Sequence, residues 1–75
     1  MKELVEYIAK AIVNAPEEVV VTQEEGEDGI VLKLQVADED KGRVIGKQGR
    51  VAQAMRTLLR VAAVREGTRA SLEII

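Results

Sequence analysis

Seven residues, Val44–Arg50, constrain this chain more than any other part of it. Their sequence, VIGKQGR, places Gly46 and Gly49 around a Lys-Gln pair, where one amphipathic segment stops and another starts. Glycine has no Cβ, so both positions can adopt backbone angles closed to other residues and can let a phosphate approach the main chain. Lys47 adds a positive charge, and the next helix would direct free amides and its positive dipole end toward the loop. The pattern predicts a phosphate cradle.

The segment before the first proline has helical periodicity. Apolar residues recur at four-residue spacing from Leu4 to Ile12, with charged residues between them, which predicts an amphipathic helix over about 2–13. Pro16 closes this helix. Tyr7 is the only aromatic residue, so the core must be aliphatic, and we expect Tyr7 within that core or at its margin.

A hairpin follows. Residues 19–23 are short and β-branched, and residues 30–36 alternate between apolar and polar side chains, so both read as strands. The acidic, glycine-bearing segment 24–29 between them is predicted to be the turn, most simply a solvated one. One face of the second strand should be buried. The residues predicted on that face are Ile30, Leu32, Leu34 and Val36.

Two helices are predicted on either side of the glycine loop. Asp38 is expected to cap a short helix that runs to about Val44 and ends at Gly46. A longer helix over Arg50–Arg65 should pack on the sheet and end at Gly67 in a left-handed conformation. The residues predicted on its sheet-facing stripe are Val51, Ala54, Met55, Leu58, Leu59, Val61 and Ala62.

The alternation in residues 69–75 predicts a third strand, which makes the element order α-β-β-α-α-β. A strand, two helices and a returning strand form a crossover, so the third strand should lie parallel beside the second. The prediction is an α+β fold with a three-stranded mixed sheet, in the order 1-2-3, and three helices on one face. Residues 1–75 are too few for more than one domain.

Composition excludes several classes of function. The chain has no cysteine and no histidine, which removes disulfides, thiolate zinc sites, thiol nucleophiles and imidazole acid–base chemistry. No spacing isolates a catalytic carboxylate pair, so an enzyme is not expected, and no metal, cofactor or small-molecule substrate is implied. No apolar run is long enough to cross a bilayer, and the start is too charged for a secretory signal, so a cytoplasmic protein is expected.

The net charge of −2 conceals a strong asymmetry along the chain. Residues 1–40 carry three lysines against eleven acids, a net charge of −8, whereas residues 41–75 carry eight basic residues against two acids, a net charge of +6. Such asymmetry indicates a polyanionic partner for the basic half, although the fold could interleave the halves. The glycine loop lies in the basic half. Nucleic acid is therefore the indicated partner.

The chain resembles a KH domain of the type II arrangement, and more closely the small bacterial single-KH proteins of the KhpA kind. The resemblance covers the whole chain, 1–75, and depends on the element order and on IGKQG at Ile45–Gly49. It implies that a GxxG loop clamps the backbone of single-stranded RNA, while the flanking helices and the nearby edge strand form a groove for bases. It also implies a homodimer, or a heterodimer with a larger KH-containing RNA-binding protein.

The predicted RNA-binding residues follow from this resemblance and from the basic residues around the loop. They are Lys41, Arg43, Ile45, Gly46, Lys47, Gln48, Gly49, Arg50 and Val51. Arg50 opposes the helix dipole, which favours a functional reason for its presence. Ala52 departs from the common KH signature, which has a branched aliphatic residue there, and Val51 lies one place early. This implies either a slightly rotated helix or a shallower groove.

Two alternatives to this interpretation are left open. The loop and helices could instead form a protein-interaction module in which RNA contact is incidental. Arg56 and Arg60 lie one turn apart on the long helix and could either contact RNA or form an ordinary solvated face.

A P-loop is excluded, because its four-residue spacing between glycines and its Lys-Ser or Lys-Thr pair are both absent.

Overall fold

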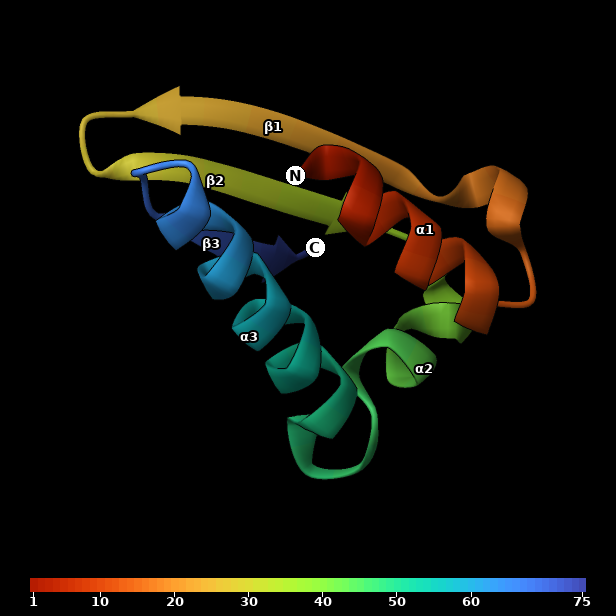
Figure 1. The fold of residues 1–75 in the computed structure, drawn as a ribbon. Helices are drawn as coiled ribbons and strands as arrows, with labels where there is room; N and C mark the ends of the chain where they lie inside the picture. Colours follow the sequence, from red (N-terminus) through yellow and green to blue (C-terminus); the bar gives the residue numbers. More distant parts are fainter.

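Three helices lie on one face of a three-stranded sheet in the computed structural model, which describes all residues from Met1 to Ile75 (Figure 1). Short 3₁₀ turns, η1 to η3, connect or extend the main elements. In chain order the elements are α1 (Lys2–Ile12), η1 (Pro16–Glu18), β1 (Val20–Gly26), β2 (Gly29–Gln35), η2 (Asp38–Asp40), α2 (Lys41–Ile45), η3 (Lys47–Gly49), α3 (Arg50–Arg65) and β3 (Ala70–Ile74). No helix has both the length and the apolar composition that a bilayer crossing requires.

The sheet has the predicted order, β1-β2-β3. β1 and β2 pair antiparallel, with Val21 opposite Leu34, and β2 and β3 pair parallel, with Leu32 opposite Leu72. The predicted mixed sheet and the α+β class are therefore confirmed. β2 occupies the centre, so β1 and β3 are both edge strands.

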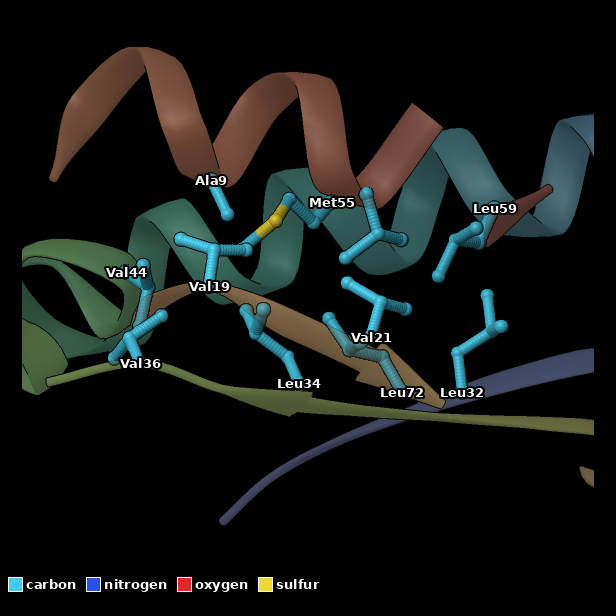
Figure 2. Packing of buried hydrophobic residues seen from close by; sticks show 11 residues of the cluster. Ala9, Val19, Val21, Leu32, Leu34, Val36, Val44, Met55, Leu59 and Leu72 are labelled. Carbon is cyan, nitrogen blue, oxygen red and sulfur yellow. The ribbon is translucent and has the colours of Figure 1, made fainter. Parts of the chain in front are cut away.

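An aliphatic core fills the space between the helices and the sheet (Figure 2). The predicted inner face of β2 is confirmed, since Leu32 and Leu34 are fully buried and Ile30 is partly buried. The buried cluster consists of Val5, Ala9, Val19, Val21, Leu32, Leu34, Val36, Val44, Met55, Leu59 and Leu72. Each fully buried aliphatic side chain of this kind contributes about 1.5–3 kcal/mol, so a few residues from each element hold the two layers together.

The acidic segment of the hairpin is mostly strand, so the prediction of a turn over 24–29 is wrong at its first residues. β1 continues to Gly26, and only Glu27 and Asp28 connect the strands. Glu24 lies across from β2, where its carboxylate Oε2 is 2.6 Å from Nζ of Lys33. Gly29 has a φ of 128°, and a Cβ built there would lie 2.4 Å from the carbonyl oxygen of Arg69. The two-residue turn is possible because Gly29 can adopt this positive φ and has no Cβ to meet the Arg69 carbonyl.

The stripe of α3 that faces the sheet agrees only in part with the predicted one: Met55 and Leu59 are buried as predicted, whereas Leu58 and Val61 are exposed. The buried residues of this helix are Ala52, Met55, Leu59 and Ala63. Leu58 is 48% exposed and Val61 56% exposed, and Val64, which follows on the same side, is 71% exposed. The helix is apolar around most of its circumference, so spacing alone fits either stripe. The small alanine side chains let the helix approach the sheet closely on either side of Met55 and Leu59.

Tyr7 is 76% exposed, so its predicted place in or beside the core is wrong. The buried residues of α1 are Val5 and Ala9. Tyr7 is two positions from each, which on a helix is about 200° around the axis.

The end of α3 agrees with the predicted left-handed cap at Gly67. Gly67 has a φ of 71°, its amide donates to the carbonyl of Val64 (3.1 Å), and the helix ends in a Schellman-type cap.

Candidate nucleic-acid interface

The loop between α2 and α3 projects away from the sheet at the lower tip of Figure 1. Gly46 ends α2 with φ 77° and ψ 173°, and its amide donates to the carbonyl of Gly42 at 2.8 Å. A Cβ at Gly46 would lie 2.5 Å from Cγ2 of Val51 and 2.9 Å from the backbone nitrogen of that residue. Both the backbone angle and the available space therefore require glycine at this position.

Gly49 differs from Gly46 in its surroundings. It has φ 74° and ψ 15°, a left-handed conformation, but a Cβ built there would meet nothing within 4 Å. Gln48, just before it, is the only non-glycine residue with a positive φ, 57°. The fold thus does not fill the space next to the Gly49 backbone. That space is open to a ligand.

The first turn of α3 carries no negative charge. It has no acidic residue and no side-chain cap, whereas α1 has Glu3 in its first turn. The amide of Gly49 donates to the carbonyl of Gly46 at 3.2 Å, and neither Lys47 nor Gln48 is a donor among the backbone hydrogen bonds of turns and loops. A 16-residue helix therefore directs an uncompensated positive end toward the loop. This arrangement suits an anion.

The predicted side chains of the loop are accessible. Lys47, Gln48 and Arg50 are exposed, and a guanidinium nitrogen of Arg50 donates to Oε1 of Gln48 at 3.4 Å. Ile45 is 40% exposed although it is a large apolar residue, whereas Val51 is partly buried against the core. Neither Lys47 nor Arg50 forms an ion pair with an acid of the chain. Their charges are therefore available to a ligand.

Lys41 and Arg43, also predicted as RNA-binding residues, do form ion pairs. Nζ of Lys41 lies 3.3 Å from Oδ1 of Asp38, and Nε of Arg43 lies 3.6 Å from Oδ1 of Asp40. Asp38 forms no capping hydrogen bond and lies within η2, so the expectation that it caps a helix is wrong. Its exposed carboxylate is used in the ion pair with Lys41 instead. The two basic residues of α2 are thus partly neutralised in place.

Asp40 is the one polar residue that is fully buried, and sequence reasoning missed it. Its two carboxylate oxygens accept hydrogen bonds from the amides of Asn14 (3.1 Å) and Ala15 (3.0 Å). Asp40 thereby joins the turn after α1 to the start of α2, whose other end forms the loop. Three acids in a row, Asp38–Asp40, begin this region, and nothing in the sequence distinguishes the third of them.

A row of polar residues leaves the loop along one side of α3. Gln53, Arg56 and Arg60 are separated by three and four positions, so they share a side of the helix. A guanidinium nitrogen of Arg56 donates to the carbonyl oxygen of Leu72 on β3, at 3.4 Å. No arginine of α3 forms an ion pair with an acid. The aspartate and glutamate side chains form no group that could hold a metal ion.

Comparison with known proteins places this geometry in a family. Residues 2–74 match the family described as "KhpA/KhpB, KH domain". The RNA-binding protein KhpA of Clostridium acetobutylicum is 55% identical over all 75 residues, which cover 100% of both chains. That of Caldanaerobacter subterraneus is 53% identical with the same coverage. That of Treponema pallidum is 54% identical over 74 residues, 99% of this chain and 92% of the relative. No solved structure matches. The three-helix, mixed-sheet fold agrees with these matches, and the chain belongs to the KhpA/KhpB KH-domain family.

Proposed function

We propose that residues 1–75 form one KH domain, of type II, that binds the backbone of single-stranded RNA without catalysing a reaction. The observation that carries this proposal is the contrast between the two loop glycines. The fold requires Gly46, but the space next to Gly49 is empty and lies at the uncompensated positive end of α3. The RNA-binding names of the relatives support the same function for this chain.

Each predicted residue has a role in this proposal. Gly46 and Gly49 admit the phosphate backbone, while Lys47 and Arg50 contact phosphates with charges that no acid of the chain neutralises. Ile45 offers an exposed apolar surface to a base, with Val51 behind it. Gln48 supplies an amide next to the backbone. Lys41 and Arg43 extend the positive surface, and because both are paired with aspartates they contribute less than Lys47 and Arg50.

Binding by one such domain should be modest. Each phosphate contact on a single strand contributes only about −0.7 to the slope of log K against log salt, and few contacts are available at this loop. A second domain linked to the first would raise the overall affinity through effective concentration. We therefore propose that the chain functions as a dimer, either with a second copy or with a larger KH-containing protein.

The exposed apolar side of α3 supports this association and also a second candidate function, a protein-interaction module. Leu58, Val61 and Val64 form this side, defined here as the outer face of α3, and none of them is buried. Contact through the outer face would leave the loop of the same chain free for RNA. Sedimentation with and without RNA distinguishes the two candidates. An RNA-binding dimer would carry the RNA with it, whereas a protein-interaction module with only incidental RNA contact would form the dimer and leave the RNA unbound.

The main test replaces Lys47 and Gln48 with aspartate together. A matched control replaces Lys10 and Gln23, which are exposed on α1 and β1, with aspartate, so that the net charge is identical. Fluorescence anisotropy with labelled single-stranded RNA should show loss of binding for the loop variant and near-normal binding for the control. Thermal melting checks that both remain folded. Unchanged RNA binding by a folded loop variant would contradict the proposal.

A further inference from the structure

The outer edge of β1 carries backbone groups without strand partners. On β2, the amide of Ile30 donates to the carbonyl of Arg69 (2.8 Å), so the backbone groups of Ile30 face β3. Those of Leu34 also face β3, because its carbonyl accepts from the amide of Ile75 (3.0 Å). Backbone groups of successive residues in a strand point to opposite sides, so the alternate residues of β2 pair with β1. The register then leaves outward-facing amides and carbonyls, defined here as the β1 edge, at Val21, Gln23 and Glu25.

The β1 edge is open to solvent. β1 is the outermost strand on the side of the sheet away from β3, and it lies along the upper margin of Figure 1, whereas the glycine loop lies at the lower tip. Val21 is the only buried residue of this strand. Proline and lysine, two residues that commonly block an edge strand, are absent from β1. The edge can therefore accept a further strand.

Negative charge surrounds the β1 edge. Residues 11–32, which include η1, β1 and the hairpin turn, contain no lysine or arginine. Only one acid of this segment, Glu24, forms an ion pair, with Lys33 across the ladder. An RNA backbone would be repelled here, whereas lysine and arginine side chains on an added strand would be attracted. The acids of this segment are Glu17, Glu18, Glu24, Glu25, Glu27 and Asp28.

We propose that the β1 edge is a docking site for an extended segment of a partner protein that is rich in lysine and arginine. The segment adds to the sheet as a fourth strand, with main-chain hydrogen bonds for affinity and its basic side chains for specificity. A second copy of this chain does not fit. Antiparallel pairing of two copies about Gln23 would bring Glu18 of each toward Asp28 of the other, and like charges across a strand pair are destabilising.

The test titrates isotope-labelled protein with an octapeptide of alternating lysine and valine, blocked at both ends, and follows the backbone amide signals by NMR. The signals of Val21, Gln23 and Glu25 should shift, and their exchange with solvent should slow, because these amides gain acceptors. Two control peptides should not bind. One has glutamate in place of lysine and reverses the charge, and the other is methylated at every backbone amide and keeps the charge without the donors.

Gln23→Pro tests the edge from the protein's side. It removes an outward amide and leaves the ladder to β2 intact, since proline is tolerated on an edge strand where the N–H faces solvent. Peptide affinity should fall about tenfold, whereas Gln23→Ala, which keeps the amide, should bind as the unmodified protein does.

Three results would overturn the proposal: no binding of the lysine peptide, equal affinity of folded Gln23→Pro and Gln23→Ala, or equal binding of the methylated peptide. If Gln23→Pro does not fold, the methylated peptide decides the same point on the unmodified protein. The inference goes beyond the proposed function and does not depend on it, because RNA binding at the glycine loop is measured separately by anisotropy.

Discussion

The buried carboxylate of Asp40 accepts a hydrogen bond from the backbone amide of Asn14, through Oδ1 at 3.1 Å, and so joins two segments 26 residues apart. Its other oxygen accepts from the amide of Ala15 at 3.0 Å. The turn after α1 and the beginning of α2 are therefore held by one side chain. Because α2 ends at the glycine loop, the position of that loop depends on this contact.

Replacing Asp40 with alanine leaves two amides without their acceptors, and we expect the free energy of unfolding to fall by about 2–4 kcal/mol. Asp40→Asn keeps one acceptor oxygen and should cost about half as much. Asp38→Asn is the control, because Asp38 is 94% exposed and pairs only with Lys41. Urea denaturation followed by circular dichroism measures all three. Equal stability of the Asp40→Ala variant and the control would show that these hydrogen bonds contribute nothing.

Most of the architecture could be predicted from the sequence because its signals are local. Periodicity placed α1, α3 and the strands within a few residues, and the left-handed conformation of Gly67 followed from its place at the end of α3. The element order then determined the mixed sheet, since a strand, two helices and a strand bring β3 beside β2.

Besides the Asp38 cap and the length of the hairpin turn, the errors concern burial, which depends on the tertiary partners. Leu58 and Ala63 are both apolar residues of α3, but only Ala63 faces the sheet, and spacing does not distinguish them. The burial of Asp40 could not be predicted because its hydrogen-bond partners are backbone amides 25 and 26 residues away. Likewise, the pairing of Lys41 and Arg43 with aspartates depends on the way the chain turns before α2. The assignment of the RNA-binding residues stays a prediction.

The two loop glycines should respond differently to the same substitution. Gly46→Ala introduces a Cβ 2.5 Å from Cγ2 of Val51 at a φ of 77°, so we expect a loss of about 2–4 kcal/mol in stability. Gly49→Ala has open space around it and should cost only about 1–2 kcal/mol for its left-handed backbone. RNA affinity should nevertheless fall sharply in folded Gly49→Ala, because the new methyl group fills the space proposed for phosphate.

Chemical denaturation and fluorescence anisotropy, carried out on the same two variants, separate these effects. The stability loss should be the larger for Gly46→Ala. A Gly49→Ala variant that is well folded and binds RNA normally would show that the open space next to this residue is not where the backbone lies.

The salt dependence of RNA binding should distinguish free from paired basic residues. Lys47→Ala removes a charge with no acidic partner, so the slope of log K against log salt should become shallower by about 0.7. Arg43→Ala removes a charge that already lies 3.6 Å from Oδ1 of Asp40, and the change should be smaller. Titrations at several salt concentrations measure the slopes. Identical slopes for both variants would contradict the distinction.

Alkaline pH should weaken the contact between β1 and β2. The hydrogen bond and the negative charge of Glu24 raise the pKa of Lys33 above its usual 10.5. A raised pKa means that this contribution is fully present below about 10.5 and is lost as the pH rises through the higher folded-state value. Glu24→Gln should therefore lower Tm slightly at neutral pH, and the difference from the unmodified protein should vanish at the alkaline end. A difference that persists there would exclude this charge pair as its cause.

Association through the outer face of α3 should depend on Val61. This residue is 56% exposed and lies on the opposite side of the helix from the buried Met55 and Leu59. Because an aspartate in a dimer contact would lose its hydration without gaining a partner, Val61→Asp should dissociate the dimer. The folded monomer should be unaffected, since the residue contacts solvent there. Val20→Asp is the matched control, because Val20 is 50% exposed on β1.

Analytical ultracentrifugation of the two variants measures whether the outer face of α3 forms the dimer contact. We expect Val61→Asp to sediment as a monomer, and Val20→Asp to sediment as the unmodified protein does. RNA affinity of Val61→Asp should fall because the second domain is lost, while binding by each single loop persists. If both variants dimerise equally, the outer face of α3 is not the contact. If Val61→Asp is monomeric but binds RNA as tightly as the dimer, the two loops do not bind one strand together.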